Sequence, residues 1–279
     1  MFLKLFKHDW KSLSRWLVPV LIGIGGAAVL GFINALVLGA TGSGNTDGRT
    51  KEALLFSTFT GTALIAMALA AALTVIAVLI FVKFYKSMVT DEAYLTFTLP
   101  VSAGRLIGAK FLSAALWTVI GAAAVFAAWI VILSGIWITG GSTLRGEVGE
   151  ITRDLFDMIW ENPQIMIPMF AYALTGAVRV WFQVTCAILF GASVVRKNKA
   201  LAAVGMVLAV NFAVNTILSL FGIAGMFSIV MGASYGITQD SGELTLPAVL
   251  WIQSGVNVLL TAVFWWWSVR IARKSVNIE

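Results

Sequence analysis

The chain has very little of what builds reactive sites in soluble enzymes. Its 279 residues include one cysteine and one histidine, and only 11% are Asp, Glu, Lys or Arg. A single cysteine excludes a disulfide framework within the chain and a thiolate metal site. We therefore expect no catalytic and no metal-binding residues, and we interpret His8 as a solvated side chain near the membrane surface and Cys186 as part of an apolar segment.

A phosphate-binding loop is also lacking. The richest glycine stretch, GATGSGNTDG at 39–48, has no lysine where the GxxxxGKS or GxxxxGKT pattern requires one. No cofactor is therefore expected on this chain. If the protein uses ATP, another chain must bind it.

Apolar residues, in contrast, dominate the composition. They make up 59% of the chain, and the mean hydropathy is +0.93, more than a soluble core of this length requires. Crossing a hydrocarbon layer roughly 30 Å thick takes about 18 or more apolar residues. Six segments are long enough: 17–38, 58–81, 111–138, 168–191, 200–221 and 247–269. The sequence predicts an all-α integral membrane protein, a single six-helix domain over 1–279.

The basic residues are distributed very unevenly between the predicted sides of the membrane. With six spans, the N-terminus, the loops at 82–110 and 192–199, and the C-terminus share one side, which has fourteen Lys and Arg residues, while the other side has four. Cytoplasmic loops hold such an excess, so we expect both termini in the cytoplasm. The pI near 9.6 then indicates contact with anionic membrane lipid and not with nucleic acid.

The N-terminal segment, 1–16, has the pattern of a helix lying on the membrane surface. Apolar side chains recur every three or four residues, opposite a basic face, and Pro19 suits a bend before the first span. Alternatively, this segment is only the cytoplasmic end of that span. The residues that define the expected helix are Phe6, Trp10, Leu13 and Arg15.

A polar insert, DEAYLTFTLPVSAGRLIGAKFL at 91–112, separates the second and third apolar segments. Leu99-Pro100 interrupts it, and Ser102 is suited to cap a following helix. Its hydrophobic residues, on a loop predicted to be cytoplasmic, favour a partner groove. The alternative is an interfacial hairpin without a partner.

The YLTFTLPVS stretch with its Leu-Ile-x-x-Lys-Phe-Leu continuation resembles the cytoplasmic loop of membrane subunits of bacterial ABC exporters of the ABC-2 kind (type V exporter-like). The local likeness covers 92–112, and the six spans and amphipathic N-terminal "connecting" helix match the family's topology. The resemblance implies that the 82–110 loop couples to a separate ATPase subunit, which binds ATP and Mg. It implies coupling roles for Asp91, Glu92, Tyr94, Leu95, Thr96, Phe97, Leu99 and Pro100.

The same resemblance implies a second permease subunit, identical or homologous, and a location in the bacterial cytoplasmic membrane. Two alternatives remain. One is an ATPase-independent membrane protein, such as a lipid scramblase or a structural or sensory subunit. The other, an intramembrane enzyme, is disfavoured because no span has paired carboxylates or a metal-ligand set.

Two external regions have patterns of their own. The loop at 139–167 contains an amphipathic pattern over 142–161, which predicts a helix that either covers the exit side or rests on lipid. The region 222–246 begins with an apolar stretch too short to cross the membrane, so we expect an external or re-entrant hairpin there.

Polar residues within the last three spans form the remaining pattern. Arg179 lies near the middle of the fourth span, and no Asp or Glu lies in any span to pair with it. The simpler interpretation of the set is hydrogen bonding between helices; the other is a path for an anionic or amphipathic substrate. The set comprises Arg179, Gln183, Asn211, Asn215, Gln253 and Asn257.

Overall fold

The structure is a computed structural model that describes residues 2–43, 48–90, 102–139, 161–194, 198–234 and 241–275, with 149–150, 153–154 and 157. Six helices in these ranges are long and apolar enough to cross a membrane, which confirms the predicted all-helical protein with six such segments. They are α1 (Phe2–Ser43), α2 (Gly48–Val89), α4 (Ala103–Thr139), α6 (Pro163–Val194), α7 (Lys199–Ser234) and α8 (Ser241–Ser275).

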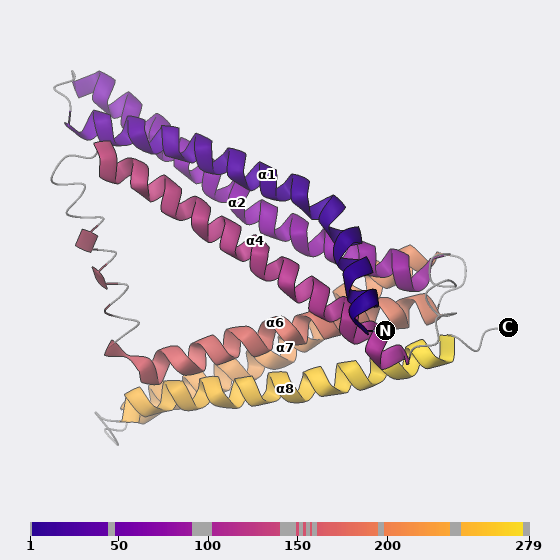
Figure 1. The fold of residues 1–279 in the computed structure, drawn as a ribbon. Coiled ribbons are helices and arrows are strands. Elements are labelled where there is room, and N and C mark those ends of the chain that lie inside the picture. Colours follow the sequence, from indigo (N-terminus) through magenta and orange to yellow (C-terminus); the bar gives the residue numbers. More distant parts are fainter. Residues whose placement is uncertain are drawn as a thin grey trace. The chain divides into compact units, whose positions relative to one another are not determined.

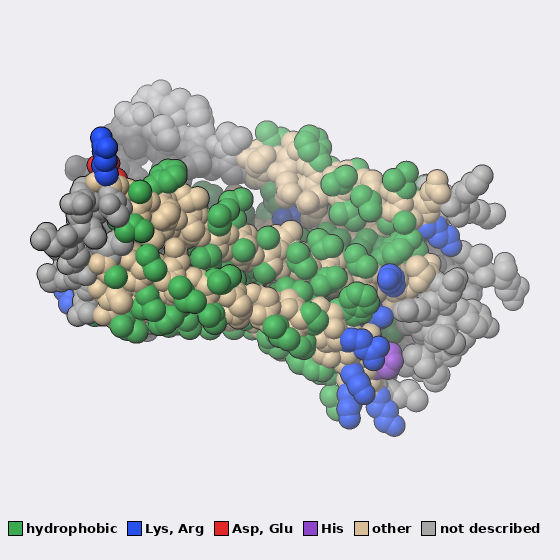
Figure 2. Space-filling model, turned by 90° about the horizontal axis from the view of Figure 1, so that it is seen from above, with side chains coloured by type: hydrophobic (Ala, Val, Ile, Leu, Met, Phe, Trp, Pro, Cys, Tyr) green, Lys and Arg blue, Asp and Glu red, His purple; other side chains and the backbone are tan. Residues whose placement is uncertain are grey.

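The outer surfaces of the helices are apolar. Phe56, Phe59 and Phe212 are each about three-quarters exposed, and Figure 2 shows hydrophobic side chains spread over the flanks of the helices. In water such a surface would be strongly unfavourable, whereas in lipid it is solvated. Several basic side chains gather beside the one histidine (Figure 2).

The chain divides into two compact units, called here unit 1 and unit 2. Unit 1 consists of Met1–Lys83 and Gly108–Phe156, and unit 2 of Phe84–Ile107 and Asp157–Glu279. Unit 1 therefore contains α1, most of α2 and most of α4. Unit 2 contains α6, α7 and α8 with the adjoining ends of α2 and α4.

In unit 1, α1 and α4 run parallel (Figure 1) and are in contact at several positions. Asp9 contacts Lys110 near one end, and Gly31 lies against Ile132 further along; both pairs are 101 residues apart in the sequence. The constant separation indicates one register along the pair. Gly135 lies so close to Phe32 that an added Cβ would be 3.0 Å from its carbonyl oxygen, the close approach that small residues permit between membrane helices.

In unit 2, α6 packs against both α7 and α8. Gln183 bonds Asn211, and eight residues further along α6, Gly191 meets Ala203, eight residues earlier on α7. The two helices are thus antiparallel in a fixed register. Residues 181–189 of α6 are all buried, so α6 is the central helix of this unit.

The N-terminal segment is not separated from the first span. Residues 2–43 form one helix with Pro19 inside it, and Figure 1 shows its axis bending near the N-terminal end. A proline inside a helix removes one backbone hydrogen bond and bends the axis without necessarily ending the helix. A connecting helix distinct from the span therefore stays a prediction.

The loops are described in part. Helix α2 continues to Val89, and α4 begins immediately after Ser102, whose carbonyl oxygen accepts hydrogen bonds from the backbone N–H groups of Arg105 and Leu106. This is the position expected for a residue at a helix N-terminus. Residues 149–150, 153–154 and 157 are helical, while the rest of the amphipathic pattern over 142–161 lies outside the described residues except Glu161.

Helix α7 continues past Gly222 into the region where an external or re-entrant hairpin is expected. The helix runs without a break to Ser234, and α8 already begins at Ser241. The stretch 222–234 has no proline, and adding residues to an existing helix costs less than nucleating a new one. Hence the expected hairpin at 222–246 consists, as far as it is described, of the ends of two long helices.

Candidate functional site: a polar cluster in unit 2

Four polar side chains form a hydrogen-bonded cluster between α6 and α7. The Arg179 Nη1 atom donates to Gln183 Oε1 at 2.5 Å. Gln183 Nε2 donates in turn to Asn211 Oδ1 at 3.1 Å, and Asn215 Nδ2 donates to the same oxygen at 2.9 Å. We call these four residues the polar cluster.

The cluster follows from helical spacing and helix register. Arg179 and Gln183 are four residues apart on α6, and so are Asn211 and Asn215 on α7, so each pair shares one helix face. The antiparallel register of α6 and α7 then brings Gln183 opposite Asn211. Gln183 is almost completely buried and Asn215 is exposed, so the cluster extends from the packed interior of unit 2 to its surface.

The two predicted residues on α8 are placed differently. Asn257 is 1% exposed and faces α6, where an added Cβ on Gly176 would be 3.6 Å from its Nδ2 atom. Among the described residues, neither its Nδ2 nor its Oδ1 has a hydrogen-bond partner. Gln253 is half-buried. The structure thus joins four of the six predicted residues by hydrogen bonds and packs a fifth, Asn257, against the same helix.

The guanidinium of Arg179 gives the cluster its charge. Arg179 is 6% exposed, and its Nε–H has no partner among the described residues. Among the described residues, Arg179 forms no ion pair; the Lys110–Asp9 ion pair lies in unit 1. A charged side chain at the centre of a bilayer costs about 2.5–3.5 kcal/mol on insertion scales. An unneutralised cation with a spare donor is suited to bind an anionic group.

Sequence reasoning did not single out two further polar side chains between helices, of which Thr185 is buried and Asn34 half-buried. Thr185 is completely buried on α6, and its hydroxyl has no partner within the described residues. In unit 1, Asn34 Nδ2 donates to Thr58 O at 3.0 Å and to Thr62 Oγ1 at 2.9 Å. The signal for Asn34 was an amide alone in the first apolar segment, with threonines in the next.

The residues predicted to form the connecting helix lie on the N-terminal part of α1. Leu13 is buried, Phe6 and Trp10 are half-buried, and Arg15 is exposed, as an amphipathic face requires. Trp10 stacks on Trp117 of α4, with ring centroids 4.7 Å apart, and Asp9 binds Lys110 at 3.3 Å. These contacts hold the segment against the first turns of α4.

The residues assigned to ATPase coupling lie outside the described residues: Asp91, Glu92, Tyr94, Leu95, Thr96, Phe97, Leu99 and Pro100. Their coupling role stays a prediction. In the described ranges, no group of three or more His, Cys, Asp or Glu side chains is placed to hold a metal ion. Comparisons with models of protein families, with curated proteins and with solved structures find no match.

Proposed function

We propose that the chain is the membrane subunit of an ATP-driven exporter of the ABC-2 kind in the bacterial cytoplasmic membrane. In this proposal it forms the translocation path with a second permease subunit, identical or homologous, and it couples through the 91–110 segment to a separate ATPase. Both termini are cytoplasmic. The protein is a transport subunit and not itself an enzyme.

The observation that carries the proposal is the position of the ABC-2-like segment relative to α4. The segment ends where α4 begins, and α4 is one uninterrupted helix from Ala103 to Thr139. A rigid helix passes a displacement at one end to the other, because its backbone is hydrogen-bonded throughout. A force applied by an ATPase at 91–100 would therefore move the whole of α4.

The N-terminal part of α1 supports this mechanism. Its contacts with α4, the Asp9–Lys110 ion pair and the Trp10–Trp117 stack, lie within four turns of the start of α4. A displacement of α4 is thereby transmitted to α1. Coupling of this kind requires packed elements with two alternative arrangements, which ATP-driven closure of the partner would favour in turn.

The polar cluster supplies the substrate contact in this proposal. Arg179 and Asn257 have hydrogen-bonding capacity that the described residues leave unused, and a buried polar group without a partner is costly. A substrate with an anionic group would satisfy Arg179 while it is bound. We assign the cluster to the translocation path on this ground.

Co-purification from native membrane tests the proposal. The tagged chain is expected to bring down a protein with a phosphate-binding loop, and Leu99→Asp is expected to abolish that association, because it places a charge in an apolar contact. Tyr94→Ala is expected to weaken the association. Leu144→Asp makes the same chemical change in a loop predicted to be external, so it serves as the matched control.

Two outcomes would contradict the proposal. If no such ATPase accompanies the wild-type chain, the ATPase-independent alternative, a scramblase or a structural subunit, is favoured. If Leu99→Asp and Leu144→Asp retain the ATPase equally, the 91–110 segment is not the contact.

A further inference from the structure

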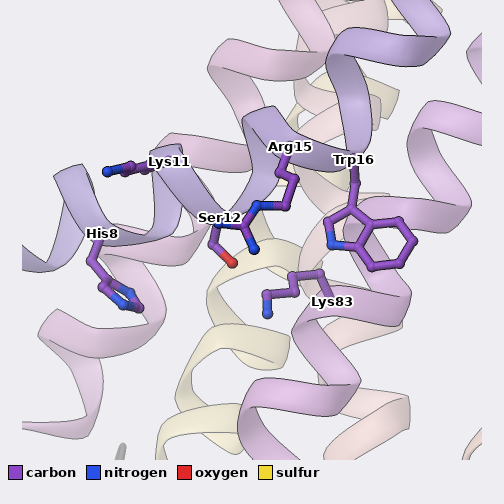
Figure 3. Close-up of a pocket in the computed structure, with 6 residues that line it drawn as sticks. All are labelled: His8, Lys11, Ser12, Arg15, Trp16 and Lys83. Carbon is purple, nitrogen blue, oxygen red and sulfur yellow. The ribbon is translucent and has the colours of Figure 1, made fainter.

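A pocket of about 280 Å³ opens between the N-terminal part of α1 and the end of α2 in unit 1. We call it the basic pocket. Five of its lining residues come from two successive turns of α1 and one from α2 (Figure 3). They are His8, Lys11, Ser12, Arg15, Trp16 and Lys83.

Three of these side chains converge on one space. In Figure 3 the hydroxyl of Ser12, the guanidinium of Arg15 and the ammonium of Lys83 are turned toward one another, whereas Lys11 points away along the helix. Guanidinium, ammonium and hydroxyl groups are all hydrogen-bond donors to phosphate, and arginine offers several in a planar fork. The donor set therefore suits a phosphate group.

Cationic side chains predominate among the described residues that line the basic pocket. None of the six lining residues is acidic, and the nearest acidic residue along α1, Asp9, binds Lys110 instead. Like charges held close together repel, and an anion between them removes that repulsion. The lining thus favours a negatively charged occupant.

The surroundings of the basic pocket indicate where such an anion comes from. The indole of Trp16 is 54% exposed, and Val18 and Val82, which lie within two residues of a lining residue in the sequence, are 43% and 44% exposed. Tryptophan is enriched at the level of the lipid headgroups, and the exposed valines on α1 and α2 add apolar surface on the same two helices. A phosphate in the pocket and acyl chains along these side chains match the two ends of a phospholipid.

We propose that the basic pocket binds the phosphate group of an anionic phospholipid, with Arg15 and Lys83 holding the charge and Ser12 donating a hydrogen bond. The bound lipid links the bent N-terminal part of α1 to the end of α2. It thereby fixes the segment that also contacts the first turns of α4. This inference does not depend on the proposed export function.

Native mass spectrometry of the full chain in detergent, titrated with phosphatidylglycerol or phosphatidylcholine, tests the proposal. The wild-type chain is expected to bind phosphatidylglycerol more tightly. Each cation removed near a lipid headgroup weakens binding about fivefold, so Arg15→Gln/Lys83→Gln should lose about 25-fold in affinity for phosphatidylglycerol. Lys4→Gln/Lys7→Gln removes two charges from α1 outside the pocket, so its affinity should stay close to that of the wild type.

Two further variants separate the pocket from general charge attraction. Ser12→Phe fills the space while every cation remains, so it should abolish the preference for phosphatidylglycerol. Arg15→Lys retains the charge and should keep most of the affinity. A melting temperature measured without lipid shows whether Arg15→Gln/Lys83→Gln is folded. If it is not, Ser12→Phe still tests the proposal.

The same titration contains the results that would overturn the proposal. Equal losses in Arg15→Gln/Lys83→Gln and Lys4→Gln/Lys7→Gln would show diffuse attraction without a site. Unchanged binding in Ser12→Phe would show that lipid binds elsewhere. If soluble glycerol phosphate displaces phosphatidylglycerol at equal concentration, the pocket takes a soluble phosphate, and the assignment to lipid is wrong.

Discussion

Polar side chains between helices differ in their hydrogen bonding in units 1 and 2. In unit 1 the amide of Asn34 donates to two acceptors on α2, and an added Cβ on Gly61 would be 2.9 Å from its oxygen, so a residue without a side chain makes room for it. In unit 2 Arg179 and Asn257 are buried with donors or acceptors that no described residue satisfies. Asn34 thus joins α1 to α2 in unit 1, whereas Arg179 and Asn257 in unit 2 retain hydrogen-bonding capacity that no described residue uses.

The helix contacts differ in the same sense. At Gly31 in unit 1 an added Cβ would meet the end of a flexible side chain, that of Ile132. At Gly191 in unit 2 it would meet backbone, 2.6 Å from Ala202 O and 2.8 Å from the Cα of Ala203. Side chains change rotamer, but two packed helix backbones must move apart. The α6–α7 contact at Gly191 is therefore less tolerant of added volume than the α1–α4 contact at Gly31.

The largest expected effect tests this difference. Gly191→Ala should lower the free energy of unfolding by about 3 kcal/mol, because overpacking against backbone forces α6 and α7 apart. Equilibrium unfolding in mixed micelles measures the change. Gly205→Ala on α7 is the matched control, since an added Cβ there meets nothing within 4 Å, and it should stabilise by up to about 1 kcal/mol through helix propensity. If both variants unfold like the wild type, the close approach of α6 to α7 is wrong.

The next largest effect is a gain in stability when Arg179 of unit 2 is replaced by an apolar residue. Arg179→Met should raise the free energy of unfolding by about 1–2 kcal/mol, because the cost of the buried charge disappears and one hydrogen bond to Gln183 is lost, worth about 0.6 kcal/mol. In the proposed exporter complex, the same variant should lose transport while it keeps its ATPase partner. A loss of stability instead would show that Arg179 holds unit 2 together and is not reserved for a ligand.

A matched pair of asparagines gives a smaller effect. Asn34→Leu should lower the free energy of unfolding by about 1 kcal/mol, since two hydrogen bonds between helices are lost. Asn257→Leu should raise the free energy of unfolding slightly, because a buried amide without partners among the described residues is replaced by an apolar side chain of similar size. Unfolding of both variants under one set of conditions makes the comparison. Equal losses in the two would remove the distinction between the units.

The six spans were predictable from sequence because length and apolarity alone determine them, and each predicted segment lies within one helix. The pairs Arg179/Gln183 and Asn211/Asn215 were visible from their spacing. The hydrogen bond that joins the two pairs was not predictable, because it depends on the register of α6 against α7. The contact of Gly191 with the backbone at Ala202 and Ala203 contributes to that register. The partners of Asn34 were not predictable either, because they depend on the register of α1 against α2. The continuation of α7 past Gly222 was not predicted, because hydropathy alone does not distinguish a short apolar stretch that extends a helix from one that forms a separate element.

The smallest expected effect lies at the end of unit 1. The Asp9 and Lys110 side chains are 18% and 10% exposed at 3.3 Å, and ion pairs near the surface contribute typically about 0.2–1 kcal/mol. Asp9→Asn should therefore lower the free energy of unfolding by about 0.5 kcal/mol, and a double-mutant cycle with Lys110→Met isolates the pair. Because salt screens partly exposed charges, the coupling should shrink between low and high salt, whereas the effect of Arg179→Met, buried in unit 2, should not. A coupling unaffected by salt would place Asp9 and Lys110 in an environment as dry as that of Arg179.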